Sequence, residues 1–172
     1  SLGNPKIIPM SENTIQIHQK YNSGICDAVK DAALNPSWKN GRVMILTESK
    51  MTEMKKGKEY GSLSAIFMQQ AKEVLPLISS TPVEAIFPSG DTDTRYLQAR
   101  FGLAASDLVQ ISSSFISFAA EILRYIENHW CMIVEDIEKG TINSEIRMPD
   151  NVRERLMTKI IPMPERAAEL RA

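Results

Sequence analysis

Residues 115–140, FISFAAEILRYIENHWCMIVEDIEKG, carry the longest regular pattern in the chain and decide how its fold is interpreted. Apolar side chains recur every three or four positions, which is the spacing of an amphipathic α-helix. This apolar stripe consists of Phe115, Ala119, Ile122, Leu123, Ile126, Trp130, Ile133, Val134 and Ile137. Lys139 suits the last turn, and Gly140 suits the left-handed position that ends many helices. At about 1.5 Å per residue the helix would run roughly 36 Å, which is enough to cross a whole domain.

Two short apolar runs predict the strands that accompany this helix. RVMILT at 42–47 is a continuous apolar run after a turn signal and is typical of a buried strand. DLVQISSS at 107–114 is a second strand, and it delivers the chain directly into the long helix. Alternation of strands and helices indicates an α/β fold, and with only these two strands the sheet is expected to be incomplete.

The rest of the chain divides into helices and connecting segments. Helices are expected at 11–34 with Ser11 as the N-cap, at 63–74, after Asp91 or Asp93, and twice around the prolines of 151–172. The lysine-rich stretch 48–62 is expected to be a loop, and Pro82 and Pro88 to bracket a few extended residues. Since no internal repeat is visible, residues 1–172 are interpreted as a single fragment of one domain.

Composition excludes several classes of function. The chain has 172 residues, of which 43% are hydrophobic and 24% charged, and its net charge of −1 argues against nucleic acid as a partner. No stretch approaches the roughly 20 apolar residues that span a membrane, and no signal segment opens the chain, so a cytoplasmic protein without membrane contact is expected. The two cysteines, Cys26 and Cys131, have no paired spacing, and only two histidines accompany them. Neither a disulfide framework nor a metal centre is therefore predicted.

The segment Gly3-Asn4-Pro5-Lys6 is a candidate nucleotide site. Glycine lets backbone N–H groups approach phosphate oxygens closely, and Gly-x-Pro-Lys commonly ends the phosphate loop of adenylating enzymes. The alternative is a simple turn that leads into a strand, because Gly and Pro mark turns in general.

The serines at 112–114 are a second candidate site. Ligands of open α/β sheets bind at the carboxyl ends of strands, and these hydroxyls follow a predicted strand. The alternative is that they solvate the strand end or cap the helix, with Ser114 as the natural N-cap before Phe115. His129, further along the helix, has no acid three or four residues away that would orient it, so we interpret it as structural.

Several ordered segments resemble a known family. ENHWCMIVEDIEKGTINSEI resembles a signature of the acyl-acid amido synthetases, the auxin-responsive Gretchen Hagen family, and the motif from Asp136 to Asn143 is its most specific part. TPVEAIF, RYLQARFGL, SSSFISFAAEILRYI and NVRERLMTKII are similar to further family segments in the same order. The opening SLGNPKIIP fits the second half of the family's phosphate loop. The resemblance covers most of the chain and is weakest between about 20 and 75.

The resemblance implies the helix-rich part of an adenylate-forming N-terminal domain. The implied enzyme uses ATP with Mg²⁺ to activate a small carboxylic acid as an acyl-adenylate, which an amino acid then attacks. Ser1, Gly3 and Lys6 would bind the nucleotide. The acyl-acid pocket would contain Tyr21, Ser114, Phe115 and Ser117. Because the remaining family motifs lie outside this sequence, we expect the rest of the adenylating domain as its partner and no activity from the chain alone.

Two alternatives remain beside this interpretation. The chain would instead be a non-catalytic helical interaction or regulatory module, or part of an acyl-CoA ligase that shares the first half-reaction and uses a thiol acceptor. The family's Ala-Ser-Gly after the strand is Ile116-Ser117-Phe118 here, so larger side chains are expected to reshape the acid pocket.

Overall fold

The computed structural model of the chain describes residues 11–32, 41–49, 51–55 and 58–172. Its contacts group the chain into two compact units, Ser1–Lys39 and Asn40–Ala172. The first unit contributes α1 (Glu12–Ala32). The Ser11 hydroxyl accepts a 3.2 Å hydrogen bond from the Thr14 backbone N–H, as a helix N-cap does. The predicted first helix and its cap are therefore confirmed.

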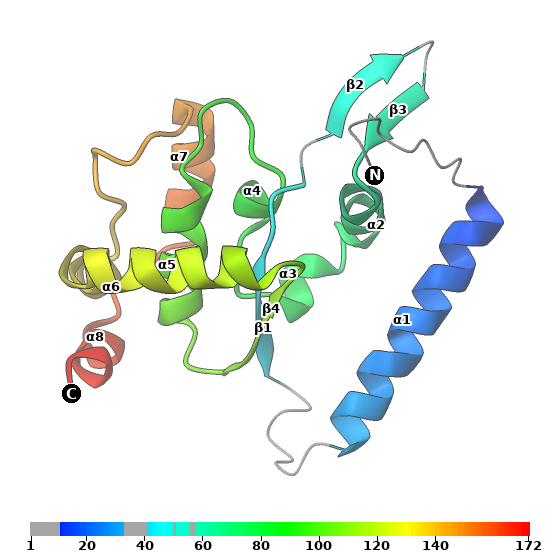
Figure 1. Cartoon of the computed structure of the whole chain (residues 1–172). Coiled ribbons are helices and arrows are strands. Elements are labelled where there is room, and N and C mark those ends of the chain that lie inside the picture. Colours follow the sequence, from blue (N-terminus) through cyan, green and yellow to red (C-terminus); the bar gives the residue numbers. More distant parts are fainter. Residues whose placement is uncertain (1–10, 33–40, 50, 56–57) are drawn as a thin grey trace. The chain divides into compact units, whose positions relative to one another are not determined.

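A two-stranded parallel sheet forms the centre of the second unit (Figure 1). β1 (Arg42–Leu46) pairs with β4 (Leu108–Ser113), with Met44 opposite Ile111 and Leu46 opposite Ser113. Both predicted strands are confirmed, and the helix-rich α/β architecture with a small sheet is as expected. The sheet lies next to α5 (Thr94–Ala104) and the long helix α6 (Ile116–Lys139).

The remaining elements are short. They are α2 (Leu63–Ala71), α3 (Leu75–Ile78), α4 (Val83–Ile86), α7 (Asp150–Met157), α8 (Pro164–Arg171) and an antiparallel pair of β2 (Met51–Lys55) and β3 (Lys58–Gly61). The helix at the start of 63–74 and the two helices around the C-terminal prolines are confirmed. The stretch 48–62 was expected to be a loop, which is wrong for its larger part, because β2 and β3 pair with each other.

The extended residues expected between Pro82 and Pro88 are also a wrong prediction, since α4 occupies this segment. Tertiary contacts hold it in place. Ser49 N–H donates a 2.7 Å hydrogen bond to the Ile86 carbonyl, and Ala85 and Ile86 are fully buried. A four-residue helix has little intrinsic stability, so such contacts rather than local preference decide its form.

The core lies between α5, α6 and α7. Tyr96 and Leu97 of α5 share one buried cluster with Ile133 and Ile137 of α6 and Leu156 of α7. Asp93 caps α5 by accepting a hydrogen bond from the Tyr96 N–H, which settles the choice between Asp91 and Asp93. On the side of α5 that faces the sheet, Gly102 lets the Met44 side chain pack closely, since an added Cβ would come within 2.5 Å of the Met44 sulfur and displace it.

The long helix is confirmed, with three differences from its prediction. Its N-cap is Phe115 and not Ser114, and no side chain caps it. Phe115 and Leu123, both placed on the apolar stripe, are 72% and 52% exposed. The helix is also kinked at His129, where φ is −120° and ψ is 17°. Its end is as predicted, because Gly140 adopts φ 66° in the left-handed region.

Candidate functional site

The carboxyl ends of β1 and β4 meet at one edge of the sheet. Because the strands are parallel, Leu46 and Ser113 are neighbours, and the polar residues that follow each strand leave from the same edge. Thr47 and Glu48 follow β1, while Ser114 and Phe115 follow β4. The ligands of open parallel sheets bind outside such an edge, so this part of the fold is the first place to look for a site.

The Ser113 hydroxyl closes the turn between β4 and α6. It donates a 2.9 Å hydrogen bond to the Phe115 carbonyl and lies 3.4 Å from the Phe115 N–H. As a result Ser114, Phe115 and Ser117 are all exposed at the start of α6. None of these three residues lines either of the two cavities described next.

A cavity of about 290 Å³ lies at the carboxyl end of β1. Its walls come from the segment after β1, the start of α5 and the first turns of α6. The lining residues are Glu48, Thr92, Asp93, Thr94, Arg95, Phe118, Glu121 and Arg147. The Thr94 hydroxyl donates a hydrogen bond to the Glu48 carboxylate, and Arg147 is ion-paired to Asp91 at 2.8 Å. Sequence reasoning missed Glu48, although its position directly after a buried strand is the signal that would have found it.

Two buried polar atoms belong to the same region. Gln98, one helical turn beyond Thr94, is fully buried and donates a 3.1 Å hydrogen bond to the Thr47 carbonyl. Its side-chain oxygen and the hydroxyl of Ser49 have no hydrogen-bond partner in the structure. An unsatisfied buried polar group costs about 1–3 kcal/mol, and such groups concentrate near functional sites. This region after β1 therefore holds buried polar atoms that packing of the strand end alone does not explain.

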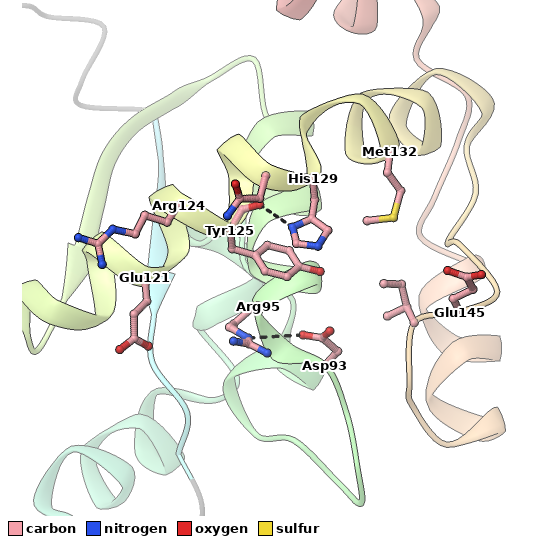
Figure 2. A pocket seen from close by; sticks show the side chains of 10 residues that line it. Asp93, Arg95, Glu121, Arg124, Tyr125, His129, Met132 and Glu145 are labelled. Atoms are coloured by element: carbon pink, nitrogen blue, oxygen red, sulfur yellow. Dashed lines mark hydrogen bonds and ion pairs between the residues drawn. The ribbon is translucent and has the colours of Figure 1, made fainter.

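A larger cleft of about 580 Å³ lies along the outer side of α6 at its kink (Figure 2). Tyr125 and His129 stack with ring centroids 4.1 Å apart, and the Arg95 guanidinium lies 5.6 Å from the Tyr125 ring centroid. Figure 2 shows the Tyr125 and His129 rings between Arg95 and Asp93 on one side and Met132 and Glu145 on the other. Burial, with a smaller contribution from Asp93, raises the pKa of Tyr125 to about 12, against the opposing charge of Arg95.

The His129 side chain contacts the helix backbone at the point where the helix kinks. Its Nδ1 lies 2.9 Å from the Tyr125 carbonyl oxygen, four residues earlier. Since a carbonyl can only accept, Nδ1 is the donor, and this assigns the proton to Nδ1 in the neutral ring. The ring thus bonds to the helix backbone one turn earlier, at the residue where the helix leaves regular geometry. This geometry supports the structural interpretation of His129.

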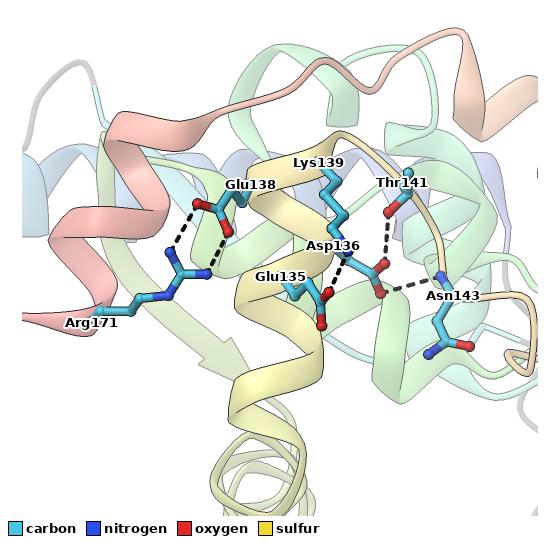
Figure 3. Close-up of polar contacts among 7 residues, drawn as sticks. All are labelled: Glu135, Asp136, Glu138, Lys139, Thr141, Asn143 and Arg171. Carbon is cyan, nitrogen blue, oxygen red and sulfur yellow. Dashed lines mark hydrogen bonds and ion pairs between the residues drawn. The ribbon is translucent and has the colours of Figure 1, made fainter.

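The Asp136–Asn143 motif forms a buried polar cluster at the end of α6 (Figure 3). The Asp136 carboxylate, 7% exposed, accepts hydrogen bonds from the Thr141 hydroxyl at 2.8 Å and from the Asn143 N–H at 3.2 Å. The buried Tyr96 hydroxyl donates a third, at 2.6 Å. Arg100 donates to the carbonyls of Thr141 and Asp136 at 2.9 and 3.2 Å. Three donors of the protein thus share this carboxylate, so the motif holds the turn after α6.

The side chains that line the two cavities suit the binding of a polar ligand. Carboxylates, guanidinium groups and hydroxyls alternate along their walls, and Phe118, Tyr125 and Met132 supply the less polar surface. Among the residues that the structure describes, no group of three His, Cys, Asp or Glu side chains could hold a metal ion. Within the same residues, no helix is long and apolar enough to cross a membrane.

The structure tests only part of the predicted site. Ser1, Gly3 and Lys6 lie outside the described residues. Tyr21 lies on α1 in the first unit and is 66% exposed. Within the second unit, Ser114, Phe115 and Ser117 lie together at the start of α6.

Comparison with known proteins identifies the family. The model of the GH3 family N-terminal domain matches residues 1–172. The chain belongs to the GH3 family. Two curated relatives of this GH3 chain are indole-3-acetic acid-amido synthetases. GH3.5 of Arabidopsis thaliana is 30% identical over 89 residues, which is 51% of the chain and 14% of the relative. GH3.8 of Oryza sativa subsp. indica is 28% identical over 94 residues, or 54% of the chain and 15% of the relative.

Solved structures of the family share the fold. The GH3.15 acyl acid amido synthetase superposes with a TM-score of 0.79 at 18% identity, and covers 98% of the GH3 chain and 30% of its own length. The AtGH3.15 acyl acid amido synthetase in complex with 2,4-DB gives a TM-score of 0.81 at 18% identity, with 98% and 29% covered. The GH3 chain thus has the fold of part of these adenylate-forming enzymes and spans less than a third of their length.

Proposed function

We propose that the chain is the central part of the adenylating domain of an ATP-dependent acyl-acid amido synthetase. The observation that carries the proposal is the family match over residues 1–172, together with the shared fold. In the proposed reaction a carboxylate oxygen attacks the α-phosphorus of ATP, and pyrophosphate leaves. The amine of an amino acid then attacks the acyl carbon, and AMP leaves as the amide forms. Mg²⁺ would enter with ATP and balance the phosphate charge.

The proposed nucleotide residues are Ser1, Gly3 and Lys6, which fit the second half of the family's phosphate loop. Backbone N–H groups at the glycine and the ammonium of the lysine would hold phosphate oxygens. The described residues carry no dedicated three-ligand metal cluster, so no step is assigned to a protein-bound ion.

The proposed acid pocket contains Tyr21, Ser114, Phe115 and Ser117. The position of Ser114, Phe115 and Ser117 at the carboxyl ends of two parallel strands supports the proposal, because ligands bind at such edges. Their exposure leaves them free to contact a ligand, with Phe115 at 72%. The neighbouring Phe118 lines the 290 Å³ cavity, so the same helix turn connects the exposed residues with the cavity wall. In this proposal the residues of this edge bind and orient the acid. Correct orientation of the reactants supplies much of the rate enhancement of such a transfer.

We also propose that the 172-residue chain is inactive alone and works with the remainder of its adenylating domain in the cytoplasm. Hydrogen bonds to charged groups contribute about 1.5–3 kcal/mol each. Without two or three of the phosphate donors, ATP would bind roughly 10²–10⁶-fold more weakly, at about 1.4 kcal/mol per tenfold change.

The test is an assay of the full-length protein with ATP, Mg²⁺ and a panel of acids that includes indole-3-acetic acid and 2,4-DB. Pyrophosphate release that depends on the acid, with amide formation that depends on an amino acid, is the expected result. Turnover with coenzyme A in place of amino acids would favour an acyl-CoA ligase. No turnover with either acceptor, while the protein is folded, would favour a non-catalytic module. The 172-residue chain serves as the matched control and should release no pyrophosphate.

A further inference from the structure

The two outer edges of the small sheet differ in whether a described segment forms hydrogen bonds with them. β1 forms backbone hydrogen bonds on both sides, because β4 pairs with one edge and residues 79–81 cover the other. On that second edge Ser80 N–H donates a 3.0 Å hydrogen bond to the Val43 carbonyl, and Ile45 N–H donates a 2.9 Å hydrogen bond to the Thr81 hydroxyl. Among the described residues no strand pairs with the outer edge of β4.

The free edge of β4 has only one of the features that protect solvent-exposed edges, an irregularity at Val109 near its start, where the register with β1 shifts. Natural edge strands carry charged residues, prolines or bulges that prevent pairing with another strand. LVQISS, the sequence of β4, contains no charged residue and no proline, and its Ile111 side chain is 49% exposed. Parallel sheets are normally buried on both faces, and a sheet of two parallel strands is too small to be stable alone. The sequence of β4 is therefore typical of a strand that has a neighbouring strand on each side.

Apolar surface continues from this edge onto the start of α6. Phe115 is 72% exposed, Ile116 87% and Leu123 52%. Ile111, Ile116 and Leu123 are grouped here as the β4–α6 apolar surface, whereas Phe115 belongs to the proposed acid pocket. Clustered exposed apolar side chains of this size mark interaction surfaces, whereas single ones are ordinary. Leu123, which the sequence places on the packing stripe of α6, is thus left half exposed by the described residues.

We propose that an extended strand from the remainder of a longer GH3 protein pairs with the free edge of β4, and that residues next to that strand cover the β4–α6 apolar surface. A strand is the occupant that satisfies a row of backbone N–H and C=O groups, because each pairs with a backbone group of the added strand. The solved relatives share the fold over 98% of this chain, which is only 29–30% of their length, so such proteins have ample chain to supply it. The inference rests on the proposed function only in placing the chain within a larger GH3 enzyme.

Hydrogen exchange measures the pairing directly. Peptides that span 108–113 are compared between the 172-residue chain and the full-length protein by mass spectrometry. Backbone amides of the outer edge should exchange at least tenfold more slowly in the full-length protein. Equal exchange in both proteins would overturn the proposal. Protection that is already present in the dilute 172-residue chain, or that rises with its concentration, would overturn it in favour of a segment of this chain or of a second copy.

A pair of matched substitutions gives a second readout. Ile111→Lys places a charge on the proposed interface, and Ile161→Lys makes the same change at a residue that is 67% exposed between α7 and α8. In the full-length protein Ile111→Lys should lower Tm by about 3 °C or more, and Ile161→Lys by less than about 1 °C. In the 172-residue chain Ile111→Lys should leave Tm unchanged and reduce aggregation. Loss of Tm with Ile111→Lys in both proteins, or in neither, would contradict the proposal.

These readouts are independent of catalysis. If the full-length protein makes no amide while β4 is protected, the proposed function fails and the strand pairing stands. If amide forms while β4 exchanges freely in both proteins, the pairing fails and the function stands.

Discussion

The Tyr96 hydroxyl on α5 donates a 2.6 Å hydrogen bond to the Asp136 carboxylate on α6, and both side chains are buried. This contact joins the two helices that form most of the core. The same carboxylate also holds the turn after α6 through Thr141 and Asn143. The most distinctive family motif in the sequence thus determines how the chain leaves the long helix. Four predictions test this relationship and the proposed site.

Asp136→Ala should destabilise the 172-residue chain by about 3–5 kcal/mol, because it leaves one buried and two part-buried donors without their acceptor. The measurement is urea unfolding followed by circular dichroism. Glu135→Ala is the matched control, since the neighbouring Glu135 is exposed and pairs only with Lys139 on the helix surface. The control should cost less than about 1 kcal/mol. Similar losses for the two variants would show that the buried cluster is not what stabilises this turn.

Tyr96→Phe should remove a pH dependence above pH 10. Burial, followed by the hydrogen bond to Asp136 and its negative charge, raises the pKa of Tyr96 above its usual value. A phenol with a raised folded-state pKa contributes its full stability below the unfolded pKa of about 10. Above it only the unfolded state loses the proton, so the free energy of unfolding should fall by about 1.4 kcal/mol per pH unit. The Phe variant should lack the contribution of Tyr96 to this fall.

The measurement for Tyr96 is the free energy of unfolding from pH 8 to 11, with Tyr125→Phe as the comparison. The pKa of Tyr125 is raised to about 12, with burial as the main cause, and this phenol is less buried. Because a phenol with a folded-state pKa of about 12 also stays protonated in the folded state up to pH 11, Tyr125→Phe should remove a fall of similar size, and only the double variant should lose both contributions. Parallel curves for wild type and Tyr96→Phe would show that the Tyr96 phenol ionises equally in both states.

Gly140→Ala should destabilise the chain by about 2–4 kcal/mol, since two effects combine there. Gly140 has φ 66°, which costs a non-glycine residue about 1 kcal/mol, and an added Cβ would lie 2.4 Å from the Pro162 nitrogen. Gly24→Ala is the control in thermal unfolding, because a Cβ there meets no atom within 4 Å and alanine favours the helix. The two substitutions should shift helical stability in opposite directions, and equal shifts would contradict the role assigned to Gly140.

Ser117→Phe in the full-length protein should raise the KM for the acid more than the KM for ATP. Ser117 is exposed on the first turn of α6, next to the strand ends, so a bulky side chain there would narrow the proposed acid pocket. Glu127→Gln, at an exposed position further along α6, is the control and should leave both values unchanged. Steady-state pyrophosphate release gives both constants. Equal increases for acid and ATP would place Ser117 outside the acid pocket.

Most regular elements could be predicted because their signals are local. The period of apolar residues predicted α6, and a run of apolar residues predicted β1. Gly140 marked the end of α6 by its backbone conformation, whereas the sequence left the cap of α5 open between Asp91 and Asp93. The pair β2 and β3 was missed because its polar sequence has no apolar alternation. α4 was missed because a helix of four residues depends on contacts such as that between Ser49 and Ile86.

From the sequence, the candidate site could be located no more precisely than at one edge of the sheet. A general rule about parallel strands pointed to the end of β4 and to Ser114, Phe115 and Ser117, whose role remains a prediction. The rule did not reveal that Glu48, Thr94 and Phe118 line one cavity, because those residues come from three different elements. Their proximity depends on how α5 and α6 pack on the sheet.

The sequence by itself determined the family, the long amphipathic helix and the turn that ends it, because periodicity, capping and glycine conformation act over a few residues. Only the tertiary structure decided what the buried groups do. It placed Tyr96 against Asp136 across 40 positions of the chain and bonded the His129 ring to the backbone at the kink. Within the described ranges it also covered the outer edge of β1 and paired no strand with that of β4. The physical reason is that these contacts join segments far apart in the chain, and their energies depend on burial that no local pattern records.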